Sequence, residues 1–113
     1  MQLIVLILNK IECLNDILKE FMSHEIKGAT ILESRGMVHS LAEYDELRFF
    51  SSLRRVLDPD HKESKTVLAV IPEEKIQTVS EIVNRVTGGL DKPDTGIIFT
   101  LPVNYVEGIG DKK

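Results

Sequence analysis

Hydrophobic positions follow two kinds of pattern along the chain, short continuous runs and runs with a helical period. Residues 2–8 form a continuous apolar run rich in β-branched side chains, which predicts a buried strand. An amphipathic helix is predicted next, because apolar residues then recur at spacings of three and four. Its apolar face holds Ile11, Leu14, Ile17, Leu18 and Phe21. Asn9 and Glu12 have the spacing of a capping box at the start of this helix.

The same two patterns occur again further along. Residues 29–34, 65–71 and 97–101 are strand-like runs, and the second of these precedes another helical pattern that ends at Gly88 and Gly89. The apolar positions of this second helix are Ile76, Val79, Ile82, Val83 and Val86. Each lies 65 residues after an apolar position of the first helix. The order is therefore β-α-β, an insertion, and β-α-β again.

This repeat predicts an α+β fold, a ferredoxin-like double βαβ with an antiparallel sheet. The 113 residues suit a single domain, with halves at 1–36 and 65–103 and a tail at 104–113. The insertion, 37–64, contains apolar residues at helical spacing, which predicts a helix over about residues 43–57. A loop of this length within a small domain is commonly functional.

The first and third strands are apolar at successive positions, so both of their faces are apolar. A ferredoxin-like sheet has helices on one face only, and a strand with one solvated face normally alternates apolar and polar residues. A second copy of the chain is the simplest cover for the remaining face. We therefore expect a closed homo-oligomer.

Composition excludes several classes of protein. The formal charge is −4 and charged residues make up 28% of the chain, which suits neither a disordered segment nor a general nucleic-acid binder. The single cysteine, Cys13, forms no internal disulfide, and the apolar start is too short to span a bilayer and lacks the features of a signal peptide. A cytoplasmic location without membrane insertion is expected. The sequence has no nucleophile–base pair, Walker loop or metal-ligand motif, so an enzyme is not expected.

The segments at residues 28–36, 87–96 and 98–103 together resemble the PII signal-transduction proteins (nitrogen regulatory protein PII superfamily). Residues 28–36 resemble the second strand of that family, which runs from a glycine and a threonine through a glutamate to a glycine at the base of the T-loop. Residues 98–103 resemble its final strand, which ends in Leu-Pro-Val. A third segment resembles its B-loop, with matching residues Thr87, Gly88, Asp94 and Gly96. The likeness covers nearly the whole chain outside the insertion.

The resemblance implies a regulatory, signal-transducing homotrimer whose three sheets face one another around the axis. It also implies a small anionic ligand, with ATP, ADP or AMP as candidates, in clefts between subunits. Residues 37–64 would be the T-loop equivalent that contacts a protein target, whose identity the sequence does not provide. The ligand-binding residues implied are Thr30, Gly36, Met37, His39, Thr87, Gly88, Gly89, Asp94 and Gly96.

The chain departs from the family in its cations. Signalling members have a lysine after the last B-loop glycine, where this chain has Ile97, and two arginines after Leu-Pro-Val, where it has Gly108 and Gly110. Such cations neutralise a triphosphate through charge-assisted hydrogen bonds. Two alternatives therefore stay open: a trimeric structural or interaction module with no nucleotide, and a CutA-like metal-tolerance protein.

Single residues also have plainer interpretations. Thr30 suits an adenine or ribose contact and equally suits an ordinary strand position. His39 could bond a phosphate or titrate near neutral pH, but solvated loop histidines are commoner. Gly36 and Gly96 suggest special backbone conformations or a close approach, either to a ligand or to another strand.

Overall fold

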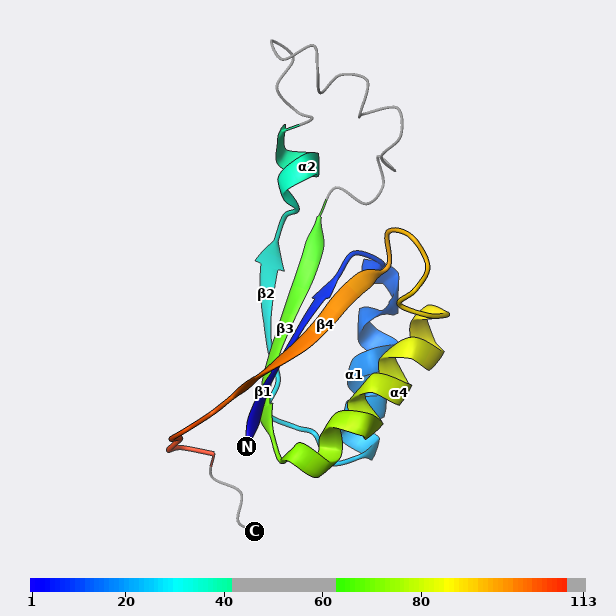
Figure 1. The fold of residues 1–113 in the computed structure, drawn as a ribbon. Coiled ribbons are helices and arrows are strands. Elements are labelled where there is room, and N and C mark those ends of the chain that lie inside the picture. Colours follow the sequence, from blue (N-terminus) through cyan, green and yellow to red (C-terminus); the bar gives the residue numbers. More distant parts are fainter. Residues whose placement is uncertain (42–62, 110–113) are drawn as a thin grey trace.

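The strands predicted from the apolar runs all form in the computed structural model, which describes residues 1–41 and 63–109. They are β1 (Gln2–Leu8), β2 (Thr30–Ser34), β3 (Ser64–Ile71) and β4 (Gly96–Pro102). β1 pairs antiparallel with both β3 and β4, and β2 pairs antiparallel with β3, so the order is β2-β3-β1-β4 (Figure 1). The described chain is thus α+β with a four-stranded antiparallel sheet, which is compatible with a ferredoxin-like fold.

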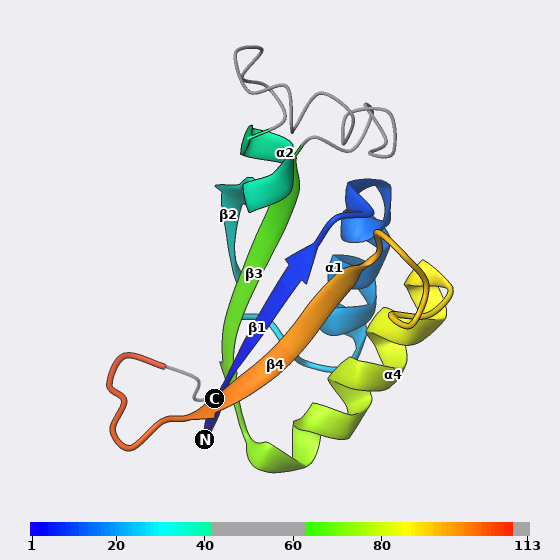
Figure 2. The same ribbon diagram turned by 45° about the horizontal axis from the view of Figure 1, so that its top comes forward.

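Both predicted helices form, each after a single turn of 3-10 helix. α1 (Leu14–Ser23) follows η1 (Ile11–Cys13), and α4 (Ile76–Thr87) follows η3 (Glu73–Lys75). The two helices lie on the same side of the sheet (Figures 1 and 2). An ion pair joins them at their exposed faces, with Arg85 Nη2 at 3.2 Å from Glu20 Oε1.

The capping box predicted at Asn9 and Glu12 was wrong. Lys10 occupies the N-cap position of η1, and no side-chain hydrogen bond caps that turn. The chain before η1 is held instead by a residue distant in sequence, because the N–H of Asn9 donates to the carbonyl of Thr95 at 2.9 Å. The N–H of Ile11 then donates to the carbonyl of Asn9, also at 2.9 Å.

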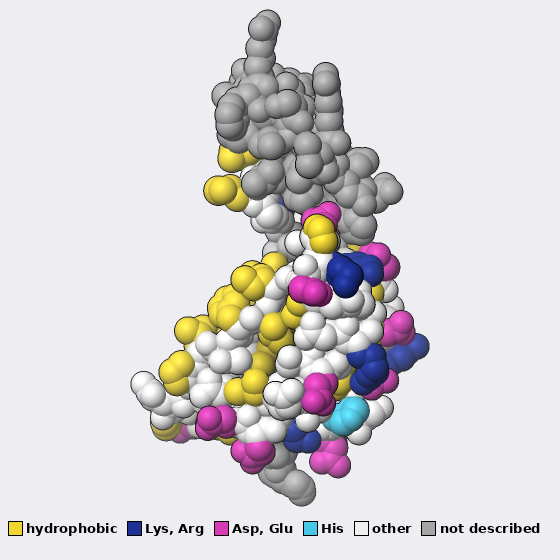
Figure 3. Space-filling model, turned by 45° about the vertical axis from the view of Figure 1, so that its right-hand side comes forward, with side chains coloured by type: hydrophobic (Ala, Val, Ile, Leu, Met, Phe, Trp, Pro, Cys, Tyr) yellow, Lys and Arg dark blue, Asp and Glu magenta, His cyan; other side chains and the backbone are white. Residues whose placement is uncertain are grey.

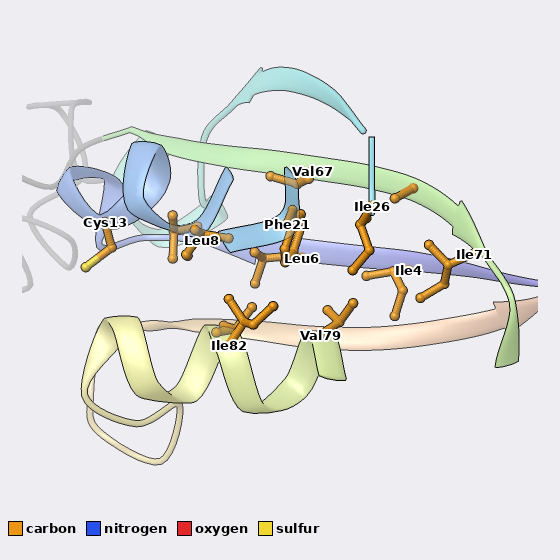
Figure 4. Close-up of a cluster of buried hydrophobic side chains, with 13 residues drawn as sticks. Ile4, Leu6, Leu8, Cys13, Phe21, Ile26, Val67, Ile71, Val79 and Ile82 are labelled. Atoms are coloured by element: carbon orange, nitrogen blue, oxygen red, sulfur yellow. The ribbon is translucent and has the colours of Figure 1, made fainter. Parts of the chain in front are cut away.

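The core lies between the helices and one face of the sheet. β1 and β3 contribute alternate residues to this face, and α1 and α4 contribute the apolar positions predicted from the helical spacing (Figure 4). The largest of these side chains are fully buried: Phe21, Ile4, Leu6, Leu8, Ile17, Ile82, Val67, Val79 and Val83. Each stabilises the fold by roughly 1.5–3 kcal/mol relative to an exposed position.

The opposite face of the sheet, which we call the open sheet face, is also apolar. Successive strand residues point to opposite faces, so the residues between the core positions point away from the helices. Val5 of β1 pairs with Leu68 of β3 and with Phe99 of β4, and the neighbouring rows are similar. The apolar members are Leu3, Val5, Ile7, Leu32, Leu68, Val70, Ile97, Phe99 and Leu101. Phe99 is 42% exposed and Leu101 47%, and a band of hydrophobic side chains runs along the body in Figure 3.

The insertion begins with a short helix that the sequence pattern did not predict. α2 (Met37–Leu41) follows Gly36 directly, and the N–H of Ser40 donates to the carbonyl of Gly36 at 3.0 Å. The helix predicted over residues 43–57 lies outside the described residues, as does the chain after residue 109.

Candidate functional site

The candidate ligand residues fall into two groups at opposite edges of the sheet. Thr30 is the first residue of β2, and Gly36, Met37 and His39 follow the other end of that strand. The remaining candidates lie between the end of α4 and the start of β4. Because β3 and β1 lie between β2 and β4, the two edges are about 14 Å apart. One chain does not bring the two groups together.

Thr87 closes the last turn of α4. Its hydroxyl donates to the carbonyl of Val83 at 2.7 Å and accepts the N–H of Gly89 at 3.3 Å. The residue is buried, and Gly88 ends the helix in the left-handed conformation, with φ of 89°. Both residues therefore have a structural role in stopping the helix.

Residues 88–95 form a loop, here called the 88–95 loop, whose first part is tied to the end of α4 by backbone N–H groups. The N–H of Gly88 donates to the carbonyl of Asn84 at 3.1 Å, and the N–H of Leu90 donates to Asn84 Oδ1 at 2.8 Å. The N–H of Lys92 donates to the carbonyl of Gly89 at 3.2 Å. Pro93 has no N–H to offer. The loop is thus held against the end of α4 by hydrogen bonds to Asn84 and by one bond of its own.

The close approach suggested for Gly96 is to a strand. A Cβ at Gly96 would lie 2.7 Å from the carbonyl oxygen of Ile7, a backbone atom of the neighbouring β1, and φ of Gly96 is 155°. Just before it, Asp94 has φ of 60°, a left-handed conformation that Asp tolerates better than most residues. The glycine therefore lets β4 start directly beside β1.

Lys10 is the residue at this loop that sequence reasoning missed. Its Nζ donates to the carbonyl of Thr87 at 2.8 Å across 77 residues of sequence. Its backbone N–H donates to the carbonyl of Thr95 at 3.1 Å. Lys10 therefore contacts the residue before the loop and the loop's last residue. No pattern could have indicated the side-chain contact, because it joins the end of a strand to the end of a distant helix.

A cluster of hydroxyl groups lies at the other edge, where the insertion leaves the sheet. Ser34 Oγ is 2.6 Å from Ser64 Oγ, and the hydroxyl of Thr66 donates to Ser34 Oγ at 2.8 Å. Ser64 is buried, so its pairing with Ser34 satisfies a group that would otherwise be costly to bury. The cluster fixes the ends of β2 and β3 at the base of the insertion.

The other candidates near this edge are not gathered into one place. Thr30 is exposed and pairs with Leu68, which puts its side chain on the open sheet face. It lies six residues before Gly36, roughly 20 Å away along an extended strand. Met37 is 74% exposed. His39 lies in α2, and its side chain is outside the described part of the structure.

The buried thiol of Cys13 lies beneath the end of α4. Its Sγ is 3.7 Å from the carbonyl of Val86. Burial raises the pKa of the Cys13 thiol, and the nearby Lys10 ammonium offsets this only in part. The group is therefore a neutral thiol at physiological pH.

Comparison with known proteins provides no assignment. No family model matches the chain, and no curated protein matches it. In residues 1–41 and 63–109, no three His, Cys, Asp or Glu side chains form a group that could hold a metal ion. None of the helices in this part of the chain is long and apolar enough to cross a membrane.

Proposed function

We propose that the chain is a PII-like regulatory protein of the cytoplasm and not an enzyme. It binds a small anionic ligand, an adenine nucleotide such as ATP, ADP or AMP, in clefts between the subunits of a homotrimer. Ligand binding changes the conformation of residues 37–64, and this changes their contact with a partner protein.

The order of the strands supports the family resemblance. In a ferredoxin-like double βαβ fold the first and third strands are central and the second and fourth are at the edges. The order β2-β3-β1-β4 has this property, and α1 and α4 follow the two central strands, β1 and β3. The two halves of the chain would then be the two βαβ units.

The position of the candidate residues at opposite sheet edges is the observation that carries the proposal. Gly36 follows β2 and Gly88 precedes β4, so two strands lie between them in one copy of the chain. Two neighbouring copies can bring opposite edges together, one contributing the base of the insertion and the other the 88–95 loop. The proposed site therefore exists only in the assembly.

The open sheet face supports the assembly itself. Nine apolar side chains from four strands line this face, and four of them are 42–55% exposed: Leu32, Ile97, Phe99 and Leu101. A monomer rarely exposes an apolar surface of this kind to water. A facing sheet from a second and a third copy would bury it. The number of copies, three, comes from the family resemblance.

Thermal unfolding against a ligand panel tests the proposal. The panel holds ATP, ADP, AMP, cyclic dinucleotides, 2-oxoglutarate and bicarbonate, each with and without magnesium. A ligand present at about one hundred times its dissociation constant adds roughly 2.7 kcal/mol per site, which raises the midpoint by several degrees. We expect a rise with an adenine nucleotide. No rise with any member of the panel would contradict a nucleotide sensor.

The hydrogen bonds that tie the 88–95 loop to the end of α4 favour the second candidate, an interaction module without a nucleotide. In that case the loop is only a stable connection between α4 and β4, and the oligomer serves to present three insertions to a partner. The same panel separates the two, since this module would assemble but show no nucleotide response. A CutA-like protein would instead bind a metal ion that survives dialysis and appears in elemental analysis.

A further inference from the structure

Both edge strands of the sheet have one side without a neighbouring strand. The order β2-β3-β1-β4 leaves one side of β2 and one side of β4 open (Figure 1). In β2 every residue except Ser34 is exposed, and in β4 every residue except Gly96 and Ile98 is exposed. Nothing in residues 1–41 and 63–109 therefore covers either edge.

The direction of the backbone groups in β4 follows from two hydrogen bonds at its ends. The N–H of Asn9 donates to the carbonyl of Thr95, and the N–H of Val103 donates to the carbonyl of Met1. Opposite residues of an antiparallel pair alternate between bonded and unbonded pairs, so odd-numbered residues make the bonds between β1 and β4. The even-numbered residues of β4 therefore direct their N–H and C=O groups to the open edge.

The open edges are formed by Ile98 and Thr100 of β4 and, by the same alternation carried across β1 and β3, by Ile31 and Glu33 of β2. Natural proteins commonly protect such edges with charged side chains, prolines or bulges. β4 has no charged residue, and the single charge of β2, on Glu33, is paired with Lys65 of β3. Both edges are thus suited to pairing with another strand.

The two open edges are also suited to each other. β1 runs antiparallel to β3 and β4, and β2 runs antiparallel to β3, so β2 and β4 run in opposite directions. A rotation about an axis along the strands keeps their directions, so β4 of one copy would meet β2 of the next in antiparallel pairing. Ile98 and Ile31 both point to the helix side of the sheet, since they pair with the core residues Leu6 and Val67. Such a pairing would therefore also align the open sheet faces of the two copies.

We propose that copies of the chain join by edge pairing, with β4 of one copy hydrogen-bonded antiparallel to β2 of the next. This inference rests on the proposed function, because it specifies how the copies of that assembly meet. In such a pair the end of β2 lies beside the start of β4, so Gly36 of one copy comes next to the 88–95 loop of the other. Edge pairing thus completes the proposed ligand site. Each copy uses two different edges, which lets three copies close into a ring.

Amide hydrogen exchange of the wild-type protein, followed by NMR, tests the pairing directly. In an open edge strand the outward N–H groups exchange quickly, whereas those bonded to the neighbouring strand exchange slowly. We expect the N–H groups of Ile98 and Thr100 to exchange as slowly as that of Phe99 between them, which bonds to β1. The N–H of Ile31 should likewise exchange as slowly as that of Leu32. Fast exchange of the outward groups in a protein of trimer mass would overturn edge pairing and leave the proposed function standing.

Proline substitution removes one outward N–H at each edge. Thr100→Pro blocks β4 and Ile31→Pro blocks β2, and β4 already has a proline at an outward position, Pro102. Thr100→Val and Ile31→Val are the matched controls, because they keep the N–H group. We expect both proline variants to lose the native mass and sediment as monomers of 12.8 kDa, and both valine variants to keep it. A mixture of the two proline variants should form a dimer and nothing larger, because one intact β4 and one intact β2 remain to pair.

The outcomes separate this inference from the proposed function. Folded proline variants that keep the native mass, or a mixture of them that stays monomeric, would overturn the pairing of β4 with β2 but not the trimer. A dimer of one proline variant alone would mean that like edges pair, and would overturn the inference too. A wild-type protein that is itself a monomer would contradict the proposed function as well. Should a proline variant not fold, as circular dichroism detects, the exchange measurement on wild type decides.

Discussion

Gly96 lies so close to Ile7 that a Cβ on the glycine would be 2.7 Å from the carbonyl oxygen of Ile7. This contact lets β4 begin beside the end of β1, directly after the 88–95 loop. The closeness involves backbone on both sides, so neither strand can relieve it by moving a side chain.

Replacement of Gly96 by alanine should therefore destabilise the protein. We expect a loss of about 1–3 kcal/mol in the free energy of unfolding, from the positive φ and from the contact with β1. Gly28→Ala is the control, because a Cβ at Gly28 meets nothing within 4 Å. It should change stability by no more than about 1 kcal/mol. Urea denaturation measures both, and equal stabilities would contradict the close approach.

The hydroxyl of Thr87 should matter for stability whether or not a ligand binds. Thr87→Val removes the bonds to the Val83 carbonyl and from the Gly89 N–H, at a cost of about 1–3 kcal/mol. Thr87→Ser keeps the hydroxyl and loses one methyl group, for about 1 kcal/mol. Chemical denaturation without ligand compares them. If valine were tolerated as well as serine, the hydroxyl would not be what holds the end of α4.

A charge on the open sheet face should dissociate the assembly. Phe99→Asp places a carboxylate among Val5, Leu101 and Leu68, where a facing sheet would have to desolvate it. Thr100→Asp is the matched control, because it changes the next residue of the same strand to the same side chain on the opposite face. We expect the first variant to be monomeric and the second to keep the native mass in light scattering. If both variants were monomeric, or if neither were, the result would contradict the open sheet face as the interface between copies.

Stability should fall at alkaline pH because of Cys13. Burial raises the pKa of its thiol above the ordinary value of 9.0, so the folded state holds the proton more tightly than the unfolded state. This contribution is fully present below the unfolded pKa and is lost as pH rises through the higher folded pKa. The difference in unfolding free energy between wild type and Cys13→Ala should therefore shrink above about pH 9. A constant difference across that range would contradict a thiol held neutral by burial.

The sequence indicated the strands and both long helices because their signals are local. Apolar runs predicted β1 and β3, and the three-and-four spacing of residues such as Ile82 predicted α4. The unbroken apolar character of β1 also predicted that the sheet would be apolar on both faces.

Features that depend on distant contacts were not predictable. The capping box at Asn9 failed because the turn there bonds to Thr95, and Lys10 was overlooked because its partner, Thr87, lies 77 residues away. Gly96 was identified as a special position, but only the pairing of β1 with β4 shows that its close neighbour is Ile7. The candidate ligand residues were assigned by resemblance, and their roles stay predictions.

The central claim is that the site is formed between copies of the chain, and the mass of the native protein in solution tests it most directly. Sedimentation equilibrium over a range of concentrations should give three times the chain mass of 12.8 kDa. The shared site requires that result, because only different copies can bring opposite sheet edges together around one ligand. A stable monomer would leave the two groups of candidate residues at opposite edges of one sheet, and would contradict both the shared site and the regulatory function built on it.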